Sequence, residues 1–89
     1  MEIVFLPEAN KDLEFLVKTG NKIVLKKITF LIEDILKHPY EGIGKPHALK
    51  HELSGSWARE INKKDRLVYE VMLNNTVEIS SLRGHYNDK

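Results

Sequence analysis

The chain has 89 residues, 42% of them hydrophobic and 30% charged, with a formal net charge of +1. This length allows one small domain over residues 1–89, and the near-neutral charge excludes a general attraction to nucleic acid. The absence of cysteine excludes disulfides and thiolate metal sites, and no apolar run or signal-like N-terminus points to a membrane, so we expect a cytoplasmic protein without membrane partners.

The first half of the chain predicts one strand and two helices. Ile3 to Leu6 is short, β-branched and apolar, as expected of a strand. Pro7 suits the first turn of a helix and Gly20 suits its end. Asn21 can cap a second helix, which must end before Pro39. Both helices carry an apolar face, so we expect a helical hairpin with one face to bury.

The second half predicts an antiparallel sheet. A stretch rich in glycine after Tyr40 is expected to be loop, followed by strands at 57–62, 66–73 and 76–83. Two-residue turns are expected at Lys63-Lys64 and Asn74-Asn75. The expected fold is therefore α+β with two layers: a β-α-α unit, then three or four strands, giving a mainly antiparallel sheet with both helices packed on one face.

The two turns also predict a register. Counting from them pairs Arg66 with Arg83 and Arg59 with Val68, so three arginines would share the uncovered face of the sheet. Guanidinium groups match phosphate geometry, which favours a polyanion there. The same register turns Glu60 toward the helices, unless a bulge re-aims it.

Residues able to transfer protons lie near this face in the sequence. The segment from Gly44 to Val68 holds six Lys or Arg against three acids, and it also holds His47 and His51. RNA carries its own nucleophile, so a base, an acid and charge stabilisation are enough to cut it without a metal. From these residues alone we expect a small α+β domain that binds RNA. A solvated basic surface, or a metal site at His47 and His51, are the alternatives.

One long segment resembles a known family. The stretch EGIGKPHALKHELSGSWAREINKKDRLVYEV, followed by RGHY, is similar to the YoeB (Txe/YoeB) toxins of the RelE superfamily. The pattern GKPxxLKxxLSGxWxRxI with RLVYxV and a final HY carries the resemblance, which extends over most of the chain. It implies the RelE-like fold, in agreement with the elements expected above.

The resemblance also implies a function. Such a toxin is a ribosome-dependent endoribonuclease that cuts mRNA in the 30S A site, without metal or other cofactor, leaving a 2′,3′-cyclic phosphate. It implies a YefM (Phd/YefM) antitoxin, contacts with rRNA, operator DNA bound only through the antitoxin complex, and a fold that allows a homodimer.

Site residues follow by matching positions. The resemblance implies that His85 is the general acid, that Arg66 stabilises charge on the phosphate, that Lys50 contributes to phosphate binding and that Tyr86 lies beside the site. RNA binding is expected from the surrounding basic residues, which are Lys45, His51, Arg59 and Arg83.

Two positions depart from the family pattern. His47 occupies the place of the family's general-base glutamate, and Glu60 occupies the place of an arginine. A neutral imidazole can accept the 2′-OH proton, so His47 is the expected base, with Glu60 as the alternative. The departure also leaves open a second function, a catalytically weakened toxin-fold protein that acts mainly with its antitoxin as an autorepressor.

Overall fold

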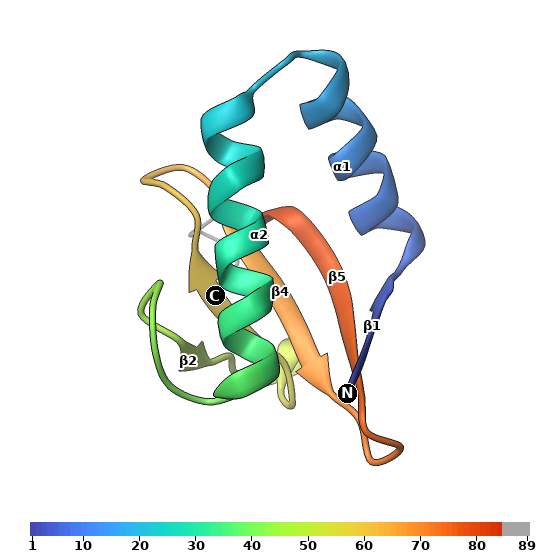
Figure 1. Ribbon diagram of the computed structural model, residues 1–89. Coiled ribbons are helices and arrows are strands. Elements are labelled where there is room, and N and C mark those ends of the chain that lie inside the picture. The colour runs from blue at the N-terminus through green and yellow to red at the C-terminus, as the bar shows by residue number, and fades with distance from the viewer. Residues whose placement is uncertain (85–89) are drawn as a thin grey trace.

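A computed structural model describes residues 1–84 as a five-stranded sheet with two helices on one side of it (Figure 1). In chain order the elements are β1 (Glu2–Phe5), α1 (Pro7–Lys18), α2 (Lys22–Lys37), β2 (His47–Ala48), the short 3-10 helix η1 (His51–Leu53), β3 (Trp57–Glu60), β4 (Arg66–Val71) and β5 (Thr76–Gly84). The predicted α+β class and element order are confirmed. Elements β2 and η1 lie in the stretch that was expected to be loop.

The helices begin and end where the sequence predicts. Pro7 occupies the first turn of α1, and the Asn21 side chain accepts a hydrogen bond from the Val24 N–H (3.3 Å) at the start of α2. Gly20, between the helices, has a φ of 69°, which glycine adopts without a steric penalty. Within residues 1–84, no helix is long and apolar enough to cross a membrane.

The sheet has the strand order β1-β5-β4-β3-β2, in which β1 runs parallel to β5 and the other neighbours are antiparallel. Both helices lie on the same side of it (Figure 1). The core fills the space between the layers and is made of Ala9, Leu16, Val24, Ile28, Leu31, Ile35, Ile61, Leu67, Tyr69, Val77, Ile79 and Leu82. We call the other side of the sheet the open face.

The hairpin between β4 and β5 differs from the prediction by one residue. Met72 donates its N–H to the Thr76 carbonyl (2.7 Å), and Asn75 donates to the Met72 carbonyl (3.2 Å) with a φ of 65°. The loop therefore has three residues, 73–75, rather than two. A type I turn followed by a left-handed residue is the usual form of such a loop.

Strand β5 is also bulged near its end. Val68 pairs with Ser81 and Tyr69 with Ile79, so Ser80 is an extra residue, and a second irregularity follows before Arg66. As a result Arg66 lies opposite Gly84. The predicted pairing of Arg66 with Arg83 is wrong, because the loop and the bulges shift the register of β5.

The turn between β3 and β4 is longer than predicted too. Ile61 donates its N–H to the Asp65 carbonyl (3.0 Å), which leaves three residues between them. The Asn62 side chain accepts hydrogen bonds from the Lys64 and Asp65 N–H groups (2.8 Å each), and these bonds stabilise the turn.

This longer turn reverses the two faces of β3. Arg59 pairs with Leu67, a core residue, while Glu60 pairs with Arg66. The expectation that Arg59 faces outward and Glu60 faces the helices is therefore wrong for both residues. A one-residue shift exchanges the faces of a strand, because side chains alternate along it.

Candidate functional site

Three neighbouring strands bring functional side chains to the open face. His47 of β2 pairs with Ala58 of β3, and Glu60 of β3 pairs with Arg66 of β4. Directly paired residues project from the same face, and so do residues two apart on one strand. His47, Glu60 and Arg66 therefore share one face of the sheet.

The His47 ring is held in a defined orientation. Its Nδ1 lies 3.0 Å from the carbonyl oxygen of Lys45, whose φ of 53° turns the backbone back toward the ring. A carbonyl oxygen only accepts hydrogen bonds, so Nδ1 must carry the proton of the neutral ring. This leaves Nε2 with its lone pair, as a general base requires. The side chain is exposed and thus accessible to a substrate.

Arg66 lies at the start of β4 and is only 5% exposed. It lines a hollow of about 250 Å³ on the open face, together with Glu8, Leu53, Val68, Ser80 and Ser81. A guanidinium recessed in such a hollow meets an anion in surroundings with little water, where charge stabilisation is strongest.

The sequence did not indicate most of this lining. Leu53 comes from η1, and Ser80 and Ser81 come from the bulged part of β5. The one available signal was the adjacent pair Ser80 and Ser81, which interrupts the alternation of polar and apolar residues in this strand, as a bulge does.

Glu60 is the acidic residue that pairs with Arg66 on the open face, where Glu70 and Glu78 also project and Glu8 lines the hollow. The Glu60 carboxylate lies 3.8 Å from Nζ of Lys45, and the Glu60 N–H donates to the Gly44 carbonyl (2.6 Å). The Lys45 side chain is 84% exposed and so remains accessible to solvent. Lys45, Glu60 and Arg66 thus alternate in charge along one edge of the site.

The remaining predicted residues occupy different surroundings. Lys50 and His51 are both exposed; Lys50 precedes η1 and His51 is its first residue. The chain before η1 is held to the chain after it by a hydrogen bond from the Leu49 N–H to the Ser56 carbonyl (2.9 Å). His85 and Tyr86 lie outside the described residues.

Two of the predicted RNA-binding arginines lie elsewhere than expected. Arg59 is fully buried, and its guanidinium is hydrogen-bonded to protein groups, so the prediction that it binds RNA is wrong. Arg83 is half-buried with its Cζ 4.0 Å from the centroid of the Phe15 ring of α1. The predicted cluster of three arginines is thus reduced to Arg66 on the open face.

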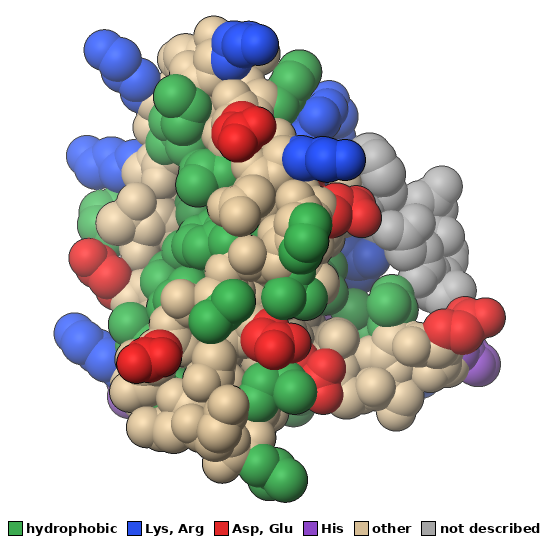
Figure 2. All heavy atoms as spheres, turned by 90° about the vertical axis from the view of Figure 1, so that its right-hand side faces the viewer, with side chains coloured by type: hydrophobic (Ala, Val, Ile, Leu, Met, Phe, Trp, Pro, Cys, Tyr) green, Lys and Arg blue, Asp and Glu red, His purple; other side chains and the backbone are tan. Residues whose placement is uncertain are grey.

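Charge on the neighbouring side of the molecule is mixed. Figure 2 views the side that carries α1 and β1, where basic, acidic and apolar side chains are interspersed among those drawn in colour. That side therefore presents no single sign of charge among the described residues. Among residues 1–84, no three His, Asp or Glu side chains gather where they could hold a metal ion.

The fold and the open face define a class of protein: a small two-layer α+β domain with a histidine and a recessed arginine on the sheet face opposite the helices, and lysines on the adjoining loop. Comparison with known proteins assigns the family. The model of the YoeB-like toxin of bacterial type II toxin-antitoxin systems matches residues 5–86. Toxin YoeB of Escherichia coli (strain K12) is 42% identical over 86 residues, which cover 97% of this chain and 100% of that protein.

Solved structures of similar proteins agree with this family. The YoeB/ParE toxin from Agrobacterium tumefaciens superposes with a TM-score of 0.91 at 33% identity, over 97% of this chain and 100% of that one. A YoeB dimer from Staphylococcus aureus has a TM-score of 0.87 at 39% identity, over 97% and 98% of the two chains. This chain belongs to the YoeB-like toxin family of type II toxin-antitoxin systems.

Proposed function

We propose that this toxin is an endoribonuclease that cuts mRNA in the ribosomal A site and so inhibits translation. Membership of the YoeB-like family supports this function. The observation that carries it is the His47 ring, whose Nε2 is available as a base on the same sheet face as the recessed Arg66. No broad basic surface is needed, because the ribosome would present the mRNA.

The proposed reaction uses the RNA's own 2′-OH. Nε2 of His47 takes the 2′ proton, and the 2′ oxygen then attacks the adjacent phosphorus as the bond from phosphorus to the 5′ oxygen breaks. His85 gives a proton to the leaving 5′ oxygen, so the products are a 2′,3′-cyclic phosphate and a 5′-hydroxyl. Arg66 and Lys50 stabilise the charge on the phosphoryl oxygens, with Tyr86 beside the site.

Binding of the RNA backbone is assigned to two exposed basic residues near His47 and to one partly exposed arginine on β5. Lys45 and His51 are both exposed and lie on the chain segment that includes His47. Arg83 is partly exposed and supplies a further positive charge close to the end of β5. Removal of any one of them should weaken binding without abolishing chemistry.

Glu60 is the second candidate for the base. It lies next to Arg66 in the sheet, and its carboxylate is ion-paired with Lys45. His47 is the better candidate, because the lone pair of its Nε2 is not used by the hydrogen bond to Lys45.

A YefM-like antitoxin is the proposed partner. YoeB-YefM complexes have been solved for Staphylococcus aureus, one of them a heterotetramer, and the toxin of that heterotetramer is 39% identical to this chain with a TM-score of 0.85. On the basis of these complexes, we propose that such an antitoxin neutralises this toxin. We also propose that the toxin reaches operator DNA only within that complex. The S. aureus YoeB dimer supports a homodimer of the free toxin.

Primer extension on mRNA-programmed ribosomes tests the function. Wild type should cut within the A-site codon, whereas His85→Ala and His47→Ala should each slow cleavage by about 10²–10⁴-fold. Glu60→Gln should cut at close to the wild-type rate. A chelator selective for transition metals should leave cleavage unchanged, since it spares the Mg²⁺ of the ribosome.

Each contrary result has a defined meaning. Full activity in His47→Ala with loss in Glu60→Gln would transfer the role of base to Glu60. Loss of cleavage in the chelator would favour a metal-dependent hydrolase. Failure of wild type to cut, together with normal antitoxin binding, would replace the nuclease by the autorepressor function.

A further inference from the structure

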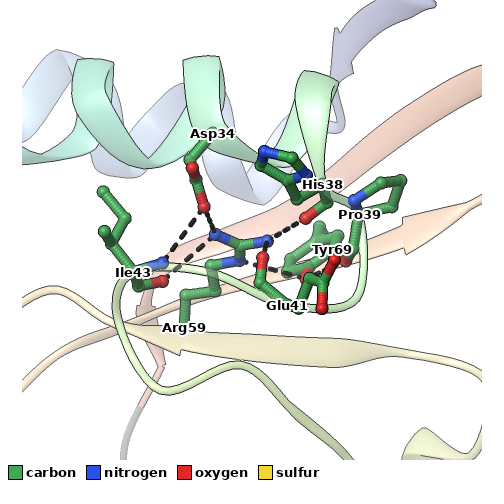
Figure 3. Close-up of polar contacts among 7 residues, drawn as sticks. All are labelled: Asp34, His38, Pro39, Glu41, Ile43, Arg59 and Tyr69. Atoms are coloured by element: carbon green, nitrogen blue, oxygen red, sulfur yellow. Dashed lines mark hydrogen bonds and ion pairs between the residues drawn. The ribbon is translucent and has the colours of Figure 1, made fainter.

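The buried Arg59 binds the loop that follows α2. Its Nη1 donates to the Ile43 carbonyl (3.1 Å), and its Nη2 donates to the carbonyls of Glu41 (2.8 Å) and His38 (Figure 3). Three backbone carbonyls of one loop thus converge on a single guanidinium from β3. Arg59 therefore fixes the path of the chain between α2 and β2.

The other donors of Arg59 are used as well. Nη1 also donates to Oδ2 of Asp34 on α2, and Nε donates to the Tyr69 hydroxyl (3.3 Å). All five N–H groups of the guanidinium therefore have acceptors. The Tyr69 hydroxyl in turn donates to the Pro39 carbonyl (2.6 Å), and burial raises the pKa of Tyr69, which keeps it protonated at neutral pH.

Asp34 binds the same loop directly. Its Oδ2 accepts the Ile43 N–H (3.1 Å), and the hydrogen bond from Arg59 lowers the pKa of Asp34. At Gly42, which has a φ of 116°, an added Cβ would lie 2.0 Å from that same oxygen. The loop backbone is therefore packed directly against the carboxylate, with no room for a side chain between them.

The loop ends at the candidate base. Gly44 lies so close to β3 that an added Cβ would be 3.1 Å from Cβ of Arg59, and its carbonyl accepts the Glu60 N–H (2.6 Å). The next residue is Lys45, whose carbonyl holds the His47 ring. A continuous set of contacts thus runs from Asp34 and Arg59, in the helix-covered layer, to His47 on the open face.

The composition of this cluster suggests a role in positioning. Arg59 is fully buried and the Asp34 side chain is 21% exposed, so the guanidinium loses its hydration and the carboxylate loses part of it, and this cost offsets much of the attraction between them. What the pair supplies is a directional geometry, and cleavage rates are sensitive to the placement of the base. Apolar residues in place of Asp34 and Arg59 could also pack against loop 38–44. They would form no hydrogen bonds to its backbone, so the path of the loop into Lys45 would not be fixed.

We propose that Asp34 and Arg59 are positioning residues of the active site, which act by fixing loop 38–44 so that Lys45 orients the His47 ring. The effect on catalysis rests on the proposed function. The effect on the loop and the ring does not, so the two can be tested separately.

Cleavage kinetics test the effect on catalysis. Asp34→Asn and Arg59→Lys should each lower the maximal single-turnover rate by about 10–100-fold, since small displacements of a catalytic group cost this much. The ribosome concentration giving half the maximal rate should stay within about twofold, because neither residue reaches the RNA. Gly42→Ala should slow cleavage in the same way, because its Cβ would displace the Asp34 carboxylate. Gly20→Ala is its control, since Gly20 also has a left-handed φ but an added Cβ there would meet nothing within 4 Å.

A double-mutant cycle identifies the residue through which they act. In a His47→Ala background, Asp34→Asn and Gly42→Ala should slow cleavage by less than about twofold further, because the group that they orient is gone. Val24→Ala, at the far end of α2, should lower stability and leave the rate unchanged at temperatures where the protein is folded. An equal loss in both backgrounds would overturn the proposal.

NMR tests the geometry without any cleavage. In Asp34→Asn, the Ile43 and Glu60 amides should exchange with solvent at least about tenfold faster, while amides of α1 keep their rates. The ¹⁵N shifts of His47 should move away from those of a ring protonated on Nδ1, toward a larger share of the tautomer protonated on Nε2. Unchanged amides and ring would overturn the proposal, whether or not wild type cuts RNA. If the amides and the ring change in Asp34→Asn but the wild type does not cut RNA, the effect on the loop and the His47 ring is sustained and the nuclease is rejected.

Discussion

At the scale of the residue, two arginines on adjacent strands show how one shift of register decides a role. Arg59 pairs with Leu67 and is buried with five acceptors, whereas Arg66 pairs with Glu60 and lines the hollow of the open face. Both side chains carry the same guanidinium group. Their different surroundings make Arg59 a structural cation and Arg66 the candidate for charge stabilisation.

Tyr69→Phe should destabilise the fold. The change removes a hydroxyl that accepts from Arg59 and donates to the Pro39 carbonyl, and it leaves both without a partner in a buried position. We expect a loss of about 1–3 kcal/mol in the free energy of unfolding, measured with urea. Tyr40→Phe is the control, because Tyr40 is 52% exposed, and it should unfold at the wild-type denaturant concentration. Equal midpoints for the two variants would contradict the assigned bonds.

Asp34 should make stability depend on pH in a defined direction. The hydrogen bond from Arg59 lowers the pKa of Asp34 from its ordinary value near 3.8, so the folded state favours the carboxylate. Its contribution is then complete above about pH 4–5 and is lost as the pH falls through the folded pKa. The difference in unfolding free energy between wild type and Asp34→Asn should therefore shrink as the pH falls from 6 to 2.

A variant with no titrating group separates this effect from general acid unfolding. Ile28→Val removes a buried methylene from the same helix, and its deficit in unfolding free energy should stay nearly constant over the same pH range. A constant deficit for Asp34→Asn as well would show that the charge of Asp34 contributes nothing.

At the scale of the element, local signals in the sequence located the helices and strands but left the register undetermined. Pro7, Asn21 and Pro39 act on their own neighbours, so the helix limits followed from them. The register depends on two loops of three residues and on the bulge at Ser80, which are set by backbone hydrogen bonds between distant residues. A loop that is one residue longer than predicted exchanges the two faces of the strand beside it. The predicted turn between β3 and β4 was one residue too short, so Arg59 was assigned to the wrong face of the sheet.

The candidate site was predictable to a different extent. His47, Lys50, Arg66 and the residues after Gly84 came from the family motif, which records chemistry rather than geometry. The role inferred for Asp34 was not visible, because it depends on contacts with residues 9 and 25 positions further along the chain. A lone acid on a helix gives no sign of such partners.

The hairpin loop offers a direct test of the register. Asn75 has a left-handed φ of 65°, which glycine adopts more easily than any other residue. Asn75→Gly should raise the free energy of unfolding by up to about 1 kcal/mol, and Asn75→Ala should lower it by about 1 kcal/mol. Asn74→Ala is the neighbouring control and should change stability by less than about 0.5 kcal/mol. In a two-residue turn at Asn74-Asn75 both positions would respond alike.

At the scale of the whole molecule, the sheet separates stability from chemistry. The helix-covered side holds the apolar core and the Arg59 cluster, and the open side holds His47, Glu60 and Arg66. The loop of residues 38–44 connects the two sides, since it is bound in the covered layer and ends at the site. Substitutions in the core should therefore affect activity mainly through this loop.

Restoring the family glutamate at position 47 tests the molecule as a nuclease. In His47→Glu a carboxylate replaces the imidazole, and these two groups ordinarily titrate near 4.3 and 6.5. If the residue at this position is the base, the variant should cut in the A site, and the acid limb of its pH–rate profile should move to lower pH. His47→Gln, which has neither base, should be slower than both by at least about 10²-fold. An acid limb that stays in place in His47→Glu would mean that a different group takes the 2′-OH proton, and Glu60→Gln in the same assay would then show whether that group is the carboxylate beside Arg66.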